Sequence, residues 1–223
     1  MLALVGGGEW TPGCEFDREL LEAAGTERVV ILPTAAAYEH PERRCLAGAE
    51  WFGQLGAEVE AVMVLRRADA EDAGAADVVR RARFVYLSGG SPLHLRSVLK
   101  DSLVFDALRE AWQGGAVVAG SGAGAMALTD PMVDPRGGAL TVGLGLVDRL
   151  AVVPQSEDGG QDPAGEKLHR SIVLAPAGLP VVVIPERTAL LRDPAGHWRA
   201  AGQGEPVVYV NGEPDPLGIG ALT

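Results

Sequence analysis

Two cysteines, few aromatic residues and no long apolar run set the first limits on this chain of 223 residues. Cys14 and Cys45 lack the CxxC spacing of a zinc site and are too few for a disulfide framework, so we expect free thiols in a reducing cytoplasm. No stretch approaches the roughly 20 apolar residues that a transmembrane helix needs. Residues 1–5 lead into a glycine run without a basic segment or an apolar stretch of secretory length, so we expect no export signal.

Basic residues are also scarce, with 19 Lys and Arg against 30 Asp and Glu and a formal net charge of -11. Nucleic-acid binding draws most of its affinity from Lys and Arg on phosphates, and anionic membranes attract the same side chains. We therefore expect neither a nucleic acid nor a membrane among the partners. No group of His and carboxylate residues has the spacing of metal ligands, so we expect no metal and no other cofactor.

Short apolar runs alternate with amphipathic helical patterns along the chain. Expected strands lie at residues 2–5, 29–32, 59–64, 84–87, 116–119 and 181–184, and expected helices at 14–24, 42–55, 72–81 and 102–113. This alternation predicts an α/β fold: a doubly wound, mostly parallel sheet with helices on both faces, in a single domain spanning residues 1–223. Near the end, apolar runs at 188–192 and 207–210 flank turn-rich residues and predict an antiparallel C-terminal edge hairpin. Residues 156–165 form the one loosely composed stretch.

Gly122 is the most informative residue of the chain. Residues 116–128 have the layout of a nucleophile elbow, in which a buried strand, a tight turn of small residues and a helix follow one another. In the G-x-Nuc-x-G pattern the central residue carries the attacking atom on a strained turn. Here residues 120–124 read Gly-Ser-Gly-Ala-Gly, so the centre has no side chain. Because glycine tolerates positive φ, we expect the turn to persist at Gly122 without a nucleophile.

Other glycine-rich loops follow the expected strands, at the carboxyl ends where open α/β sheets bind ligands. Gly6, Gly7 and Gly8 follow the first strand, and Gly89 and Gly90 follow the fourth. The N–H groups of Gly89 and Gly90 would face an oxyanion or a carboxylate. Glycines after strands often only make turns, but their occurrence together with an elbow favours a ligand site.

Six segments, in this order, resemble the cyanophycinase and dipeptidase E group, the S51 serine peptidases. They are residues 4–9 (LVGGGE), 30–36 (VILPTAA), 87–90 (LSGG), 120–125 (GSGAGA), 143–146 (GLGL) and 185–190 (PERTAL). The resemblance implies a class I glutamine-amidotransferase-like, flavodoxin-like fold and a serine nucleophile in G-x-S-A-G. It also implies a downstream histidine as the base, and cleavage next to aspartate or at β-aspartyl links.

Two departures from the family pattern concern catalysis itself. The family serine falls on Gly122, and counting from Gly143 without gaps places the family histidine at Gln155. A Gln side chain cannot accept a proton at neutral pH, so both nucleophile and base are missing in this alignment. Glu186 matches an acidic position of the family. We expect a ligand to contact Gly89, Gly90, Ser91, Ala123 and Glu186.

The resulting hypothesis is an S51-like protein that has lost serine peptidase activity and binds an acidic small molecule, a peptide or a protein partner. The alternative is an active serine or cysteine hydrolase of Asp-containing peptides, with Ser121 or Cys14 as nucleophile and His169 as a substitute base. Ser121 is equally suited to a helix cap or a buried hydrogen bond, and a lone histidine on a polar helix is commonly only solvated. Fold analogy also allows an amidotransferase-like partner subunit, and a homodimer stays open.

Overall fold

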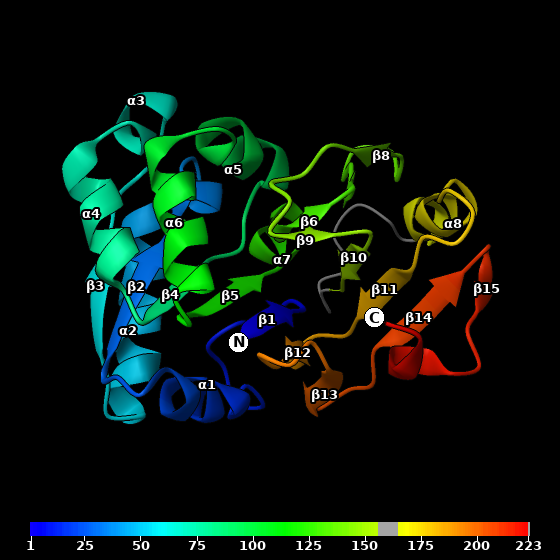
Figure 1. Cartoon of the computed structure of the whole chain (residues 1–223), viewed down its shortest axis with the longest axis horizontal. Coiled ribbons are helices and arrows are strands. Elements are labelled where there is room, and N and C mark those ends of the chain that lie inside the picture. Colours follow the sequence, from blue (N-terminus) through cyan, green and yellow to red (C-terminus); the bar gives the residue numbers. More distant parts are fainter. Residues whose placement is uncertain (156–164, 223) are drawn as a thin grey trace.

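The computed structural model describes residues 1–155 and 165–222, and its centre is a seven-stranded sheet in the order β13-β12-β1-β5-β4-β2-β3 (Figure 1). The parallel strands are β1 (Leu2–Val5), β2 (Arg28–Leu32), β3 (Glu58–Ala61), β4 (Phe84–Leu87) and β5 (Val117–Ser121). Strands β1, β4 and β5 are buried along their whole length, which explains their uninterrupted apolar sequences. The predicted doubly wound, mostly parallel sheet is therefore confirmed.

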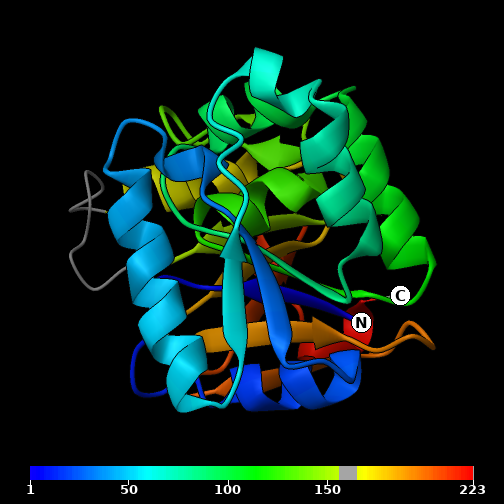
Figure 2. The same cartoon turned by 90° about the vertical axis from the view of Figure 1, so that its left-hand side faces the viewer.

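Helices cover both faces of this sheet, and Figure 2 shows α2 on one side with α4 and α6 on the other. One face packs against α1 (Phe16–Ala24) and α2 (Pro41–Gln54). The opposite face packs against α3 (Arg67–Ala70), α4 (Ala73–Arg81), α5 (Pro92–Leu99), α6 (Leu103–Gln113) and α7 (Ala123–Leu128). The strands thus lie between two separate apolar clusters, and their carboxyl ends are left free to carry loops.

The predicted first residues of α4 and α6 lie one position before each helix, because each of them is its cap. The Asp72 side chain accepts a hydrogen bond from the N–H of Ala75 at the start of α4. The Ser102 hydroxyl accepts one from the N–H of Phe105 at the start of α6. Both side chains satisfy backbone donors that a helix cannot satisfy itself.

A second, four-stranded sheet lies beside the main one in the order β10-β11-β14-β15. Its strands are β10 (Ala151–Pro154), β11 (Val181–Ile184), β14 (Val207–Val210) and β15 (Glu213–Pro214). Two short strand pairs, β6 (Thr129–Asp130) with β9 (Val147–Asp148) and β7 (Met132–Val133) with β8 (Leu140–Thr141), lead into it from α7. The other elements described are α8 (Glu166–Val173) and the 3-10 helices η1 (Thr34–Ala36) and η2 (Gly218–Ala221).

The C-terminal hairpin exists, but its predicted second strand was wrong. Strand β12 (Thr188–Arg192) pairs antiparallel with β13 (Trp198–Gly202), and β14 instead pairs with β11 in the second sheet. The sequence of β13, Trp-Arg-Ala-Ala-Gly, has only a weak apolar alternation, because this edge strand is only partly buried. A turn with Gly196 at a φ of 93° joins β12 to β13 within the segment that was predicted to be irregular.

The loosely composed stretch at residues 156–165 lies outside the described residues, apart from Gly165. Within residues 1–155 and 165–222, none of the helices combines the length and the apolar composition needed to cross a bilayer.

Candidate functional site

Four loops meet at the carboxyl end of β1. The N–H of Gly6 donates to the carbonyl of Thr188 at 2.9 Å, and the N–H of Gly7 donates to the carbonyl of Gln155 at 2.8 Å. The N–H of Gly122 donates to the carbonyl of Val5 at 3.0 Å. The fold therefore brings together the first glycine loop, the elbow, Gln155 and the segment that contains Glu186, as expected for an open α/β sheet.

The elbow keeps the backbone of a nucleophile turn. Gly122 lies between β5 and α7 with φ of 51° and ψ of -109°, so the expected positive φ is observed. A Cβ at Gly120 would lie 2.6 Å from the backbone of Gly124, and one at Gly124 would lie 2.3 Å from the carbonyl oxygen of Leu87. These contacts explain why the turn needs small residues on both sides of its centre.

Space for a side chain remains at the centre of the elbow. A Cβ built on Gly122 would meet only the Cα of Gly89, at 3.8 Å, which is ordinary van der Waals contact. Among the described residues, no neighbouring side chain occupies the place of the side chain that Gly122 lacks. The elbow therefore has room for a side chain at Gly122, and the Gly89 loop lies beside it as predicted.

Gln155 joins the site through its backbone. Its carbonyl accepts from Gly7 and its N–H donates to the carbonyl of Ile184 at 2.8 Å, which fixes the end of β10 against the first glycine loop. Its side chain is exposed. An uncharged amide at this position can donate and accept hydrogen bonds, but it cannot act as a general base.

The four histidines lie elsewhere in the fold. His40 precedes α2 and is exposed, and His169 is exposed on α8. The Nε2 atom of His94 lies 2.8 Å from the carbonyl oxygen of Leu65, and the Nδ1 atom of His197 lies 3.1 Å from a carboxylate oxygen of Asp193. Within the described part of the chain, none of the four is hydrogen-bonded to Ser121 or Cys14.

The two candidate substitute nucleophiles are both buried. The Ser121 hydroxyl donates to the carbonyl oxygen of Gly6 at 2.9 Å, and the residue is only 1% exposed. The Sγ of Cys14 lies 3.4 Å from the carbonyl oxygen of Gly8. Burial raises the pKa of the Cys14 thiol to about 11, so the thiol is protonated at neutral pH. Ser121 makes the buried hydrogen bond considered from the sequence, and Cys14 lacks the low pKa of a reactive cysteine.

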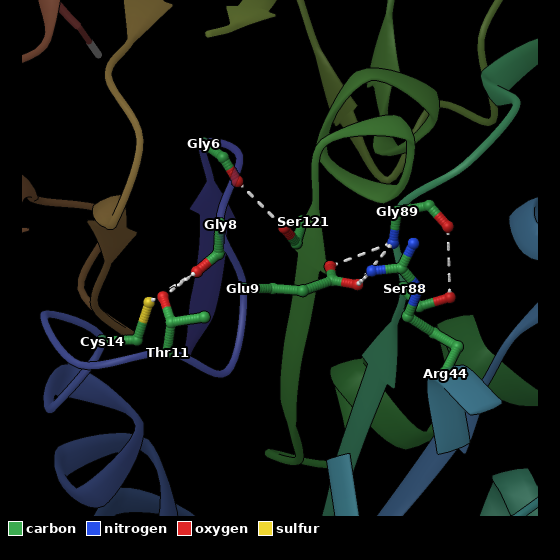
Figure 3. Close-up of polar contacts among 9 residues, drawn as sticks. All are labelled: Gly6, Gly8, Glu9, Thr11, Cys14, Arg44, Ser88, Gly89 and Ser121. Atoms are coloured by element: carbon green, nitrogen blue, oxygen red, sulfur yellow. Dashed lines mark hydrogen bonds and ion pairs between the residues drawn. The ribbon is translucent and has the colours of Figure 1, made fainter. Parts of the chain in front are cut away.

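Glu9 is the residue of the site that sequence reasoning missed. Both carboxylate oxygens accept the N–H of Gly89, at 3.1 and 3.0 Å, and one of them lies 3.3 Å from Nη1 of Arg44 (Figure 3). Burial raises the pKa of Glu9, while the Arg44 charge opposes that rise. The signal was present in the sequence, since a charged residue follows three glycines directly at the end of a buried strand.

The other residues predicted to contact a ligand differ in whether their hydrogen-bonding groups already have partners. The N–H of Gly89 is taken by Glu9, and the hydroxyl of Ser91 accepts the N–H of His94 as the cap of α5. Gly90 is exposed, and its N–H has no hydrogen-bond partner among the described residues. Ala123 is the buried first residue of α7, a helix of only six residues. Of these residues, Gly90 is therefore the one whose N–H is available to a ligand.

Glu186 lies at the edge of the first glycine loop. A Cβ at Gly7 would lie 3.2 Å from Cγ of Glu186, so the acidic side chain packs directly on that loop. Its carboxylate lies 3.6 Å from Nη2 of Arg187, and its side chain is largely buried. Glu186 is therefore part of the same loop cluster, held by an ion pair with its neighbour.

A second buried acid lies beneath the site, on the face of the sheet that α1 and α2 cover. Asp17 accepts a hydrogen bond from Nε1 of Trp51 at 2.9 Å, and its other carboxylate oxygen has no partner among the described residues. Burial raises the pKa of Asp17 to about 8, although the Trp51 hydrogen bond opposes the rise. Burial also raises the pKa of Tyr86, whose hydroxyl is likewise unpartnered among the described residues.

A family model for peptidase family S51 matches residues 2–196 of this chain. The chain therefore belongs to peptidase family S51. It is 28% identical over 163 residues to a cyanophycinase from Trichormus variabilis, an alignment that covers 70% of this chain and 54% of that protein. It is 26% identical over 150 residues to a cyanophycinase from Synechococcus elongatus, covering 66% and 47%. The chain spans about half the length of the curated relatives it matches.

Solved structures support the same family and fold. The chain resembles the crystal structure of a peptidase from an acI-B1 Actinobacterium with a TM-score of 0.85 and 27% identity, covering 96% of this chain and 92% of that one. It also resembles a putative peptidase E protein from Listeria monocytogenes with a TM-score of 0.60 and 16% identity, covering 94% and 97%. The second likeness concerns the fold alone.

Proposed function

We propose that this S51-family protein has lost serine peptidase catalysis and acts by binding an acidic small molecule or an acidic peptide. The observation that carries the proposal is Gly122, which holds the strained elbow conformation with open space at its Cα and no attacking atom. Without a nucleophile there is no acyl-enzyme, and an uncharged Gln155 supplies no base. The fold and its loops remain, while the two groups that cleave a peptide bond are absent.

The alternative, an active hydrolase with a displaced nucleophile, has less support. Ser121 has a backbone carbonyl as its acceptor and is enclosed by the sheet, so a substrate carbonyl cannot reach its oxygen without local unfolding. The Cys14 thiol is buried and protonated at neutral pH. A nucleophile needs a base within hydrogen-bond reach, and His169 lies exposed on α8 without a bond to either residue.

Acidic ligands are favoured by the donors that surround the elbow. Arg44 pairs with Glu9, which holds the N–H of Gly89, and the Arg44 side chain is 37% exposed (Figure 3). A guanidinium has five N–H donors, so Arg44 can hold Glu9 and a ligand carboxylate together. The N–H of Gly90, which has no partner among the described residues, is the second donor. Glu9 limits the site, because its own charge excludes a ligand carboxylate from the Gly89 amide.

A hydrolysis assay tests the loss of activity. We expect no turnover of β-Asp-Arg dipeptides, Asp-X dipeptides or ester substrates by the purified protein, because the uncatalysed reactions are slow enough for even a poor triad to be detected. The matched variants are Ser121→Ala and Cys14→Ala. Turnover that survives rigorous purification and disappears in either variant would overturn this part of the proposal.

Calorimetry with the acidic dipeptide Asp-Ala and its side-chain amide, Asn-Ala, tests ligand binding. We expect the acidic dipeptide to bind more tightly than the amide, and Arg44→Gln to abolish that difference. Arg43→Gln is the matched control, since the neighbouring Arg43 is exposed on the same helix and forms no ion pair within the described residues. Circular dichroism confirms that each variant is folded. Equal binding of both ligands, or no binding at millimolar concentration, contradicts an acidic-ligand site.

A further inference from the structure

A cavity of about 430 Å³ lies at the opposite end of β1 from the elbow. In the register of the sheet, Val5 of β1 is paired with Ser121, next to the elbow, whereas Leu2 is paired with Arg192, which lines the cavity. A strand rises about 3.3 Å per residue, so roughly 10 Å of sheet separate the two places. The cavity also borders η2, which packs against β13 near the C-terminus (Figure 1). This cavity is therefore distinct from the family site.

Arg192 is the distinctive side chain of the cavity. Among the residues described, its buried Nε has no hydrogen-bond partner and its guanidinium forms no ion pair. Other arginines of this acidic chain are paired, such as Arg80 with Glu110 and Arg136 with Asp134. An unpaired buried donor is unfavourable, so the Nε of Arg192 favours an acceptor from outside the chain. The chain has an excess of acids, yet its fold places none of the described ones on Arg192.

Trp198 gives the cavity an aromatic wall. The Cζ of Arg192 lies 5.6 Å from the centroid of the Trp198 ring, within the range of a cation–π contact. Leu146 and Leu222 line the same cavity and add apolar side chains to it. A second cavity of about 440 Å³ shares Arg192, Trp198 and Leu222 with the first. Arg192 therefore lines both cavities.

A second arginine reinforces the positive charge of the lining. Arg149 has a φ of 59°, an uncommon conformation for a residue other than glycine, and its N–H donates to the carbonyl of Asp130 at 2.8 Å. It forms no ion pair among the described residues. Asp148 is the acid in the lining and is exposed. Two arginines against one aspartate leave the lining positive in a chain whose net charge is -11.

We propose that this cavity binds a small organic acid, with its carboxylate on Arg192 and an apolar or aromatic body against Trp198 and Leu222. The planar guanidinium fork matches a carboxylate with two parallel hydrogen bonds. The volume lies within the range of small-molecule sites, and charged side chains in the lining can fix the orientation of a ligand. The site is independent of the elbow, so either proposal can fail without the other.

Titration of the whole protein with phenylacetate tests the site, with phenylacetamide as the uncharged analogue and phenyl phosphate as the alternative oxyanion. Calorimetry and Trp fluorescence measure binding. We expect saturable binding of phenylacetate, at least tenfold tighter than of phenylacetamide, and a loss of at least tenfold in Arg192→Gln. If phenyl phosphate binds more tightly than phenylacetate, the assignment to a carboxylate is wrong.

Arg199→Gln is the matched control, because Arg199 lies on the same strand as Trp198 and pairs with Glu19 on the surface. We expect it to bind phenylacetate as the unchanged protein does. Arg149→Gln is a second test variant, to be used if Arg192→Gln does not fold. We expect Arg149→Gln to weaken phenylacetate binding severalfold. The proposal fails if phenylacetate does not bind at millimolar concentration, or if the folded arginine variants bind it as tightly as the control.

Discussion

The carboxylate of Glu9 holds the backbone N–H of Gly89 with both of its oxygens, across 80 residues of sequence. This contact connects the loop after β1 to the loop after β4, beside the elbow that follows β5 (Figure 3). Hydrogen bonds to a carboxylate are stronger than those between neutral groups, and here Glu9 is buried while the bond itself is partly buried. Glu9 therefore fixes the position of the Gly89 loop and occupies an amide that a ligand would otherwise meet.

Loss of the Glu9 carboxylate destabilises the fold. Glu9→Ala leaves the Gly89 amide and Arg44 without their partner, so we expect a loss of about 2–3 kcal/mol in the free energy of unfolding. Glu9→Gln retains one acceptor and costs less, about 1 kcal/mol. Urea unfolding measures both. Glu22→Ala, on the exposed surface of α1, is the control and stays within about 0.5 kcal/mol. A Glu9→Ala variant as stable as that control would show that the contact is dispensable.

The buried carboxyl of Asp17 makes the protein less stable at alkaline pH. Its pKa is raised from 3.8 to about 8, so the folded protein keeps a proton that the unfolded chain releases. Stability is therefore greatest below pH 3.8 with respect to this group, falls as the pH rises to about 8 and then levels off. Glu9, whose pKa is also raised, contributes with the same sign.

Asp17→Asn removes this titration, because the amide stays neutral and still accepts a hydrogen bond from Trp51. We expect the difference in Tm between the variant and the unchanged protein to grow in favour of the variant from pH 5 to pH 9. Differential scanning calorimetry at four pH values measures it. Parallel pH profiles for the two proteins would mean that Asp17 titrates normally.

Alanine substitutions at three glycines with positive φ distinguish the cost of backbone strain from the cost of a steric clash. Gly25, at the end of α1, has open space where a Cβ would lie, so Gly25→Ala reports the conformational cost alone, about 1 kcal/mol. Gly122→Ala should cost somewhat more than Gly25→Ala through its backbone alone, because a φ of 51° with a ψ of -109° lies outside the left-handed helical region, while its Cβ meets only one atom at 3.8 Å. Gly90→Ala should cost more, because its Cβ would lie 2.3 Å from the carbonyl oxygen of Ala35. Chemical unfolding of the three variants establishes the order. A Gly122→Ala variant less stable than Gly90→Ala would contradict the open elbow.

Both cysteines should react slowly in the folded protein. Burial raises the pKa of Cys14 and of Cys45 to about 11, and only a small thiolate fraction is present at pH 8. We expect thiol titration with a chromogenic disulfide to be slow in buffer and fast in urea, with two thiols per chain. Rapid modification of Cys14 in the folded protein, located by mass spectrometry, would restore it as a candidate nucleophile.

The sequence by itself determined the parallel sheet, most helix positions and the elbow, because these depend on local patterns. Continuous apolar runs mark β1, β4 and β5, and the small residues around Gly122 permit only a tight turn. The same local patterns also predicted that the Gly89 loop lies at the carboxyl end of its strand.

Tertiary structure alone decided the partners of the edge strands and the contacts of charged side chains. Strand β13 has too little apolar alternation to be read locally, and its pairing with β12 depends on the exposed edge that β12 offers. Glu9 meets Gly89 and Arg44, and Arg192 stays unpaired among the described residues, only because strands distant in sequence lie side by side. Charge pairing between such segments has no local signature, since it depends on side-chain geometry that the folded sheet creates.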